Sequence, residues 1–237
     1  YAVTGSVNEA IWQGSATGTL VVAKAAATVV LQHLAQTYDG TARTVTATTM
    51  PAGLEVEITY DGHSWVPTNA GNYAVTGMVN EANWQGLATG TLVVAQASAL
   101  VYLQNLAQVY DGTARTASAT TMPAGLAVEF TYDGHAWAPT NAGSYFVAGT
   151  VNEANWQGSG TGTLAVSRAQ DTITFAQTNQ VYDGTGKVVT ATAGSGEPVA
   201  VTYDGSTNLP VNAGSYSVTG VVNAANWTET NTATLTI

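Results

Sequence analysis

Residues 38–41 read Tyr-Asp-Gly-Thr, and the same four residues return at 110–113 and again at 182–185, each time 72 positions further on. The likeness between the first two copies is extensive, because residues 26–97 and 98–169 are identical at 52 of 72 positions. A fixed period of this kind is typical of tandem arrays, in which each unit is one small structural module. We therefore predict a truncated repeat at 1–25, of which only the C-terminal part is present, and whole repeats at 26–97, 98–169 and 170–237.

The junctions between these repeats carry no spacer. Residues 22–25, 94–97 and 166–169 contain neither a proline nor a Gly/Ser run, the compositions that make a linker extended or flexible. We therefore expect stiff junctions and an extended rod. The chain opens at Tyr1 in the middle of the pattern, so we interpret it as a piece of a longer protein.

The pattern within each repeat is that of β-strands. Residues 54–60 alternate strictly, with Val56, Ile58 and Tyr60 on one face, which is typical of a half-buried strand. No window shows a helical period, so we predict an all-β fold of five to seven short strands per repeat, arranged as an immunoglobulin-like sandwich. Further strands are expected in segments rich in β-branched residues, at 28–34, 44–49, 73–79 and 90–94.

The segment Asn69-Ala70-Gly71-Asn72-Tyr73 resembles the tyrosine corner of immunoglobulin domains, in which a tyrosine hydroxyl bonds back to upstream backbone. Val75 takes the position of the second cysteine of such domains, and the chain has no cysteine, so apolar packing alone must join the two sheets. The corner residues are predicted to be Asn69, Gly71 and Tyr73, with Asn141, Gly143 and Tyr145 in the second repeat and Asn212, Gly214 and Tyr216 in the third.

The order of these motifs resembles the MBG type of bacterial immunoglobulin-like repeat over essentially the whole chain. The motifs are Tyr-Asp-Gly-Thr, Met-Pro-Ala-Gly-Leu, Tyr-Asp-Gly, Asn-Ala-Gly-x-Tyr and a closing Thr-Gly-Thr-Leu strand. The third repeat departs from them at residues 193–198 and 208–210. The resemblance implies tandem modules of large secreted or surface-anchored bacterial proteins, often adhesin-like, and it supplies no catalytic or ligand residues.

Composition excludes several function classes. The formal net charge is -10, with only 5 Lys and Arg, so the clustered cations that nucleic acid or an anionic membrane surface requires are missing. No run approaches the 18 apolar residues of a membrane span, so we expect no membrane insertion within this chain. Lys187 aligns with Arg43 and Arg115, and we expect it to be an ordinary exposed cation.

No motif for catalysis is present, and we predict that the chain is not an enzyme and has no catalytic, cofactor-binding or metal-binding residues. There is no Gly-x-Ser-x-Gly, P-loop, dinucleotide fingerprint or His-Glu-x-x-His. Glu55 and Glu57 share a strand face, which favours a solvated surface over a glycosidase pair. Structural calcium is the alternative to no cofactor, because Asp39, Asp61 and Glu81 lie in predicted loops.

Aromatic residues give the candidate contact sites. His63 and Trp65, repeated as His135 and Trp137, could stack on a sugar or a partner, or Trp65 could pack on its own sandwich or on the adjacent repeat; we favour packing. A second aromatic set stands in or near Asn-x-x-Asn-Trp, and we interpret it as core lids or junction plugs. Its members are Trp12, Trp84, Trp156 and Trp227, with Ile11 replacing the second Asn before Trp12.

These observations favour a structural repeat region of a secreted or cell-surface bacterial protein, acting as an adhesin stalk or scaffold. A self-assembling extracellular filament or sheath is the first alternative, because the low charge of 8% weakens repulsion between chains. A carbohydrate-binding array is the second. The expected partners are neighbouring repeats, like chains in a fibre, or a host or matrix glycan.

Overall fold

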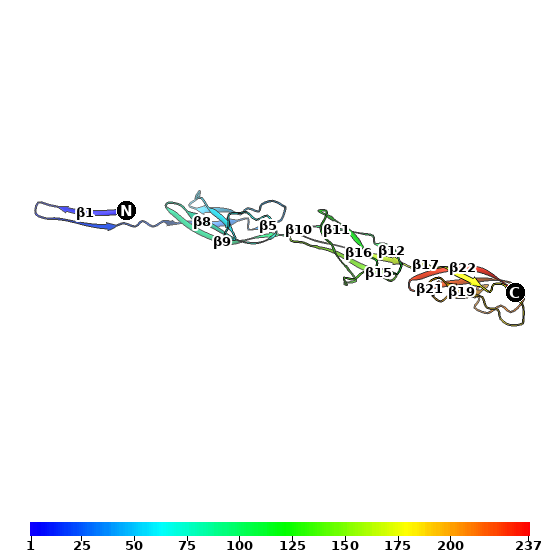
Figure 1. Ribbon diagram of the computed structural model, residues 1–237. Helices are drawn as coiled ribbons and strands as arrows, with labels where there is room; N and C mark the ends of the chain where they lie inside the picture. Colours follow the sequence, from blue (N-terminus) through cyan, green and yellow to red (C-terminus); the bar gives the residue numbers. More distant parts are fainter. The chain divides into compact units, whose positions relative to one another are not determined.

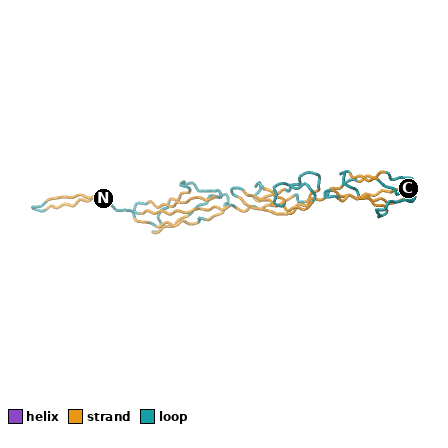
Figure 2. Tube along the Cα trace, turned by 90° about the horizontal axis from the view of Figure 1, so that it is seen from below, coloured by secondary structure: helices purple, strands orange, loops and turns teal.

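A computed structural model describes residues 1–237, and every regular element in it is a β-strand (Figure 2). The chain divides into two compact units. The first comprises Tyr1–Ser98 with Ala154–Trp156, and the second comprises Ala99–Glu153 with Gln157–Ile237. The structure contains no helix that could span a membrane. The predictions of an all-β fold and of tandem repeats are confirmed.

The first whole repeat contains seven strands. Figure 1 labels β5, β8 and β9 among them. They are β3 (Ala25–Ala26), β4 (Thr28–Gln32), β5 (Ala35–Thr37), β6 (Thr46–Met50), β7 (Glu57–Tyr60), β8 (Gly71–Asn80) and β9 (Trp84–Ala95). One sheet has the order β3-β9-β8-β7, with β5 also paired to β9, and the second consists of β4 and β6 alone. The opening segment therefore begins beside β9, crosses to the small sheet as β4, and returns beside β9 as β5.

The later repeats keep this arrangement. The second contains β10 (Ala97–Ser98), β11 (Leu100–Gln104), β12 (Ala107–Val109), β13 (Ser118–Met122), β14 (Glu129–Tyr132), β15 (Gly143–Asn152) and β16 (Trp156–Ser167). The third contains β17 (Ala169–Gln170), β18 (Ile173–Ala176), β19 (Thr190–Ala193), β20 (Ala200–Tyr203), β21 (Ser215–Asn223) and β22 (Trp227–Thr236). In the third repeat the counterpart of β5 is reduced to one bridge, between Asn179 and Thr236.

The core of each repeat is a short apolar cluster between the two sheets. In the first repeat Val75 and Leu92 are 1% and 0% exposed, and Tyr60 is buried beside them. The Tyr60 hydroxyl accepts a hydrogen bond from the Val45 amide at 2.8 Å, which satisfies the polar end of a buried ring. Tyr132 and Tyr203 accept the same bond from Ala117 and Val189 in the other repeats.

Glycines let the small sheet lie close to the large one. A Cβ on Gly77, in β8, would stand 2.8 Å from the Leu31 side chain and 3.3 Å from that of Val56. Gly90, in β9, faces Leu34 in the same way, at 3.1 Å. The inner face of the β8–β9 hairpin therefore alternates glycine with the large residues that fill the core.

The N-terminal residues form a lone hairpin of β1 (Ala2–Asn8) and β2 (Gln13–Thr19), paired from Ala2↔Thr19 to Asn8↔Gln13. It corresponds to β8 and β9 of a whole repeat. Its Val3 and Val7 are 49% and 55% exposed, whereas the equivalent Val75 and Val79 are 1% exposed. The contrast shows that the hairpin residues become buried only where the other strands of a whole repeat cover them.

The strand predicted at 90–94 is part of the longer β9, and another predicted strand is shorter for a physical reason. The alternating segment 54–60 is β-strand only from Glu57. The amide of Glu55 donates to the Glu81 carboxylate at 2.7 Å, so it is not available to a strand ladder. The turn at Asp61-Gly62 forms as expected, since both residues have positive φ (49° and 79°) and Tyr60 bridges to His63.

Candidate functional site

The Tyr-Asp-Gly-Thr segment forms a closed loop centred on its aspartate. Asp39 Oδ1 accepts hydrogen bonds from the Thr41 amide at 2.9 Å and hydroxyl at 2.6 Å, and Oδ2 lies 2.6 Å from the Arg43 guanidinium. Arg43 also donates twice to the Thr37 carbonyl oxygen, at 3.0 and 2.7 Å. The Thr41 hydrogen bonds, with Arg43 close by, hold the pKa of Asp39 below its usual value.

The expectation that Lys187 is an ordinary exposed cation is wrong. Lys187 is only 7% exposed, and its Nζ lies 2.6 Å from Asp183 Oδ2. It occupies the place of Arg43 in the loop, where the aspartate four residues earlier requires a cation. The hydrogen bonds from Lys187 and Thr185 place the pKa of Asp183 far below its usual range.

The predicted tyrosine corner has its hydrogen bond in all three whole repeats. Tyr73 Oη donates to the Asn69 carbonyl oxygen at 3.0 Å, and Tyr145 and Tyr216 donate to Asn141 and Asn212 at 2.9 Å. The Tyr73 ring lies over Gly71, where a Cβ would stand 3.3 Å from the hydroxyl. Glycine at this position lets the ring fold back across the corner.

In the second unit the corner of one repeat binds the Asn-x-x-Asn-Trp loop of the next. Asn226 Oδ1 accepts a hydrogen bond from the Ala142 amide at 2.8 Å. Asn226 Nδ2 donates to Asn141 Oδ1 at 3.2 Å. A single asparagine side chain thus satisfies both an amide and a side chain of the corner, and we name this pair of hydrogen bonds the asparagine clasp.

The first unit contains the same clasp. The Ala70 amide donates to Asn155 Oδ1 at 2.8 Å, and Asn155 Nδ2 donates to Asn69 Oδ1 at 3.1 Å. The two sides of each clasp stand about a repeat apart in the sequence, and the geometry agrees between the units to within 0.1 Å. The clasp is therefore a repeated feature of the array.

An aromatic contact accompanies each clasp. Trp227, next to Asn226, makes a T-shaped contact with the ring of Tyr110, with centroids 5.5 Å apart and planes at 81°. Trp156 meets Tyr38 at 5.6 Å and 83°. We name the surface that receives each loop the acceptor surface; it combines the corner with the tyrosine of Tyr-Asp-Gly-Thr. These two tryptophans are junction plugs.

The Asn-x-x-Asn-Trp loop that meets the corner is itself held in place by hydrogen bonds. At the junction that leads into the third repeat, Arg168 donates to Asn223 Oδ1 at 2.5 Å, and the Ala169 amide donates to the Asn226 carbonyl oxygen at 2.9 Å. The first Asn of the motif therefore anchors the loop to the junction segment that precedes its repeat. The second Asn is left to make the clasp.

The candidate contact residues form two exposed stacks. His63 and Trp65 lie 6.4 Å apart with planes at 25°, and Trp65 also meets Tyr73 edge-on at 6.0 Å. His135 and Trp137 stack more closely, at 5.1 Å and 19°. Trp65 is 49% exposed and Trp137 66%, so each tryptophan keeps about half of its surface or more in solvent.

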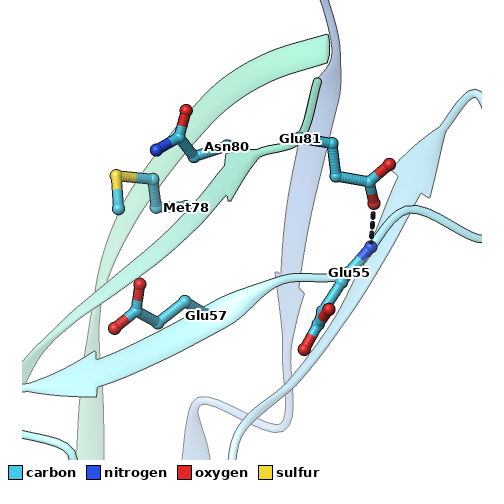
Figure 3. Close-up of a pocket in the computed structure, with 5 residues that line it drawn as sticks. All are labelled: Glu55, Glu57, Met78, Asn80 and Glu81. Carbon is cyan, nitrogen blue, oxygen red and sulfur yellow. Dashed lines mark hydrogen bonds between the residues drawn. The ribbon is translucent and has the colours of Figure 1, made fainter. Parts of the chain in front are cut away.

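The carboxylates considered for calcium are engaged by the protein. Asp61 Oδ1 accepts a hydrogen bond from the Ala74 amide at 2.8 Å. Glu81 lines a pocket of about 350 Å³ together with Glu55, Glu57, Met78 and Asn80 (Figure 3). Within this group the Glu55 amide donates a hydrogen bond to the Glu81 carboxylate. No three His, Asp or Glu side chains gather in a way that could hold a metal ion.

Sequence reasoning found both sides of the clasp but did not pair them. It treated Asn69 and Asn141 as corner residues and Trp156 and Trp227 as lids or plugs, and gave no role to Asn155 or Asn226. The available signal was an asparagine kept before the tryptophan in every whole repeat.

Comparison with known proteins agrees with the repeat pattern. A family model described as MBG domain matches residues 1–26, 27–98, 99–170 and 171–237. No curated protein matches the chain. Among solved structures, a similar one is described as Sidekick-1 immunoglobulin domains 1-5, with 13% sequence identity and a TM-score of 0.32. The match covers 85% of this chain and 56% of that one.

Proposed function

Because the chain belongs to the MBG domain family throughout its length, we propose that it is a non-enzymatic structural region of a secreted or cell-surface bacterial protein. In this role it acts as an adhesin stalk or scaffold, which carries another part of the protein away from the cell. The observation that carries the proposal is the asparagine clasp with its tryptophan, because it fastens one repeat to the next by specific contacts.

Stiffness is what a stalk requires of its junctions. The clasp fixes one side chain by two hydrogen bonds, and the Trp227–Tyr110 contact adds an aromatic pair of the kind that is worth about 0.5–1.5 kcal/mol beyond its buried area. Together with a junction that has no flexible spacer, these contacts oppose bending between the second and third repeats.

The junction can be measured with spin labels, because the chain has no native cysteine. Ser159 and Thr230 are exposed and occupy equivalent positions in β16 and β22, so Ser159→Cys with Thr230→Cys reports on the second unit. We expect a narrow distance distribution by pulsed electron resonance. Asn226→Ala with Trp227→Ala should broaden it.

The matched control is Asn83→Ala with Trp84→Ala, the same motif in the first repeat, which should leave the distribution narrow. A distribution as narrow in the Asn226 and Trp227 variant as in the parent would contradict a clasp-stiffened junction. Electron microscopy of the native full-length protein tests the wider role, since a stalk gives discrete surface rods. Continuous fibres would favour the filament or sheath instead.

Glycan binding is the second candidate function, favoured by the exposed His–Trp stacks. Trp65 and Trp137 are exposed aromatic residues of the kind that can contact a ligand, and each stacks on a histidine. Glycan-array binding that disappears in a Trp65→Ala, Trp137→Ala variant would support this role. Absence of binding at millimolar sugar would dismiss it.

A further inference from the structure

The third repeat carries a third example of the acceptor surface, formed by Tyr182, Asn212 and Ala213. Its corner has the geometry of the occupied ones, because Tyr216 Oη donates to the Asn212 carbonyl oxygen at 2.9 Å, as Tyr145 does to Asn141. The surface is therefore already shaped before anything binds to it.

This surface is unoccupied. Tyr182 is 56% exposed, whereas Tyr38 and Tyr110, which meet tryptophans, are half-buried. Ala213 is exposed, whereas Ala142 is half-buried beneath Asn226. Neither the Ala213 amide nor the Asn212 side chain has a hydrogen-bond partner, although their counterparts at Ala142 and Asn141 both do.

We propose that Tyr182, Asn212 and Ala213 form a docking site for the Asn-x-x-Asn-Trp loop of a following MBG repeat. The asparagine side chain would accept a hydrogen bond from the Ala213 amide and donate one to the Asn212 side chain, and the tryptophan would make a T-shaped contact with Tyr182. Two occupied copies of the same surface define this partner chemistry.

The site also implies selectivity among loops. The N-terminal hairpin has Ile11 at the position of Asn83, Asn155 and Asn226, so its loop keeps the tryptophan but lacks the amide. An isoleucine can neither accept the Ala213 amide nor donate to Asn212. Loops of the Ile-Trp kind should therefore occupy this surface poorly.

The test extends the whole chain after Ile237 with a second copy of residues 167–237, which continues the repeat in register because Ile237 corresponds to Val166. The readout is hydrogen exchange of the Ala213 amide, followed by NMR. In the unextended chain it should exchange faster than the clasped Ala142 amide. In the extended chain it should slow by about ten-fold, as a new hydrogen bond requires.

The matched control carries Asn226→Ile in the appended copy alone, so that the added strand and core remain. Ala213 exchange should then return toward its rate in the unextended chain, while Ala142 stays protected. A second variant, Tyr182→Ala in the extended chain, removes an exposed ring and should also raise the Ala213 rate. Equal Ala213 protection with Asn226 and with Ile in the appended loop would overturn the proposal.

Discussion

At the scale of single residues, one loop is closed by two different cations. Arg43 binds Asp39 and also donates twice to the Thr37 carbonyl oxygen, so it retains partners if the carboxylate is lost. Lys187 is nearly buried and is paired with Asp183. The aspartate of this loop therefore contributes more to stability in the third repeat than in the first, because a buried ammonium without a counter-charge is costly.

Asp183→Asn should lower the melting temperature of the third repeat by several degrees at pH 7, and Asp39→Asn should have a smaller effect on the first. The pKa of Asp183 is lowered on folding, so its stabilisation is present above the ordinary value of 3.8 and is lost as pH falls through the folded value. Calorimetry between pH 7 and pH 2 should show a weaker acid dependence in Asp183→Asn. Identical melting of variant and parent across this range would contradict the assignment.

At the scale of the strand, the thinness of the sandwich depends on glycine in β8 and β9. Gly77 has Leu31 and Val56 directly against it, and Gly149 has Leu103 and Val128. The N-terminal hairpin offers a comparison, since Gly5 occupies the same position as Gly77 and has nothing within 4 Å. The close approach of the small sheet, and not the strand itself, is what requires glycine here.

Gly77→Ala should therefore destabilise the first repeat by about 1–3 kcal/mol, the usual cost of overpacking a filled core. Gly5→Ala, the matched substitution on the open hairpin, should change the free energy of unfolding by less than about 0.5 kcal/mol. Denaturant unfolding of the whole chain measures both. Similar effects of the two substitutions would show that strand propensity, and not the packing of Leu31, decides the outcome.

The sequence predicted the long strands and the corner because each has a local pattern. Alternation and β-branched residues mark β8 and β9, and Asn-Ala-Gly-x-Tyr marks the corner. It could not predict the crossing of the first strand between the sheets, since β3 and β5 are too short to show a period. The sequence does not reveal the clasp, because its two sides are about a repeat apart. It does not reveal the burial of Lys187 either, because the ion pair with Asp183 that accompanies this burial is seen only in the structure.

At the scale of the molecule, each repeat is small and contributes to its neighbour. A chain of about 70 residues buries only about 60% of its unfolded surface, so its core leaves little margin. In the second unit the contacts of Asn226 and Trp227 with the preceding repeat add to that core. Stability should then depend on the number of joined repeats, as in other arrays.

Residues 98–169 alone should accordingly melt well below the 237-residue chain. The isolated repeat loses the clasp that Asn226 makes with its corner and the edge contact of Trp227 with Tyr110. Calorimetry of the isolated repeat and of the whole chain in one buffer makes the comparison. Equal midpoints would mean that the repeats are energetically independent.

The pairing of the first strands with the last one determines how a repeat meets tension. β3 and β5 run parallel to β9, with Ala25 beside Trp84 and Thr37 beside Ala95, and β12 runs parallel to β16 in the same way. A pull on the two ends of a repeat drags these neighbouring strands in opposite directions along their length. Their hydrogen bonds then share the load in shear, whereas a hairpin pulled open from its free ends would lose them one at a time.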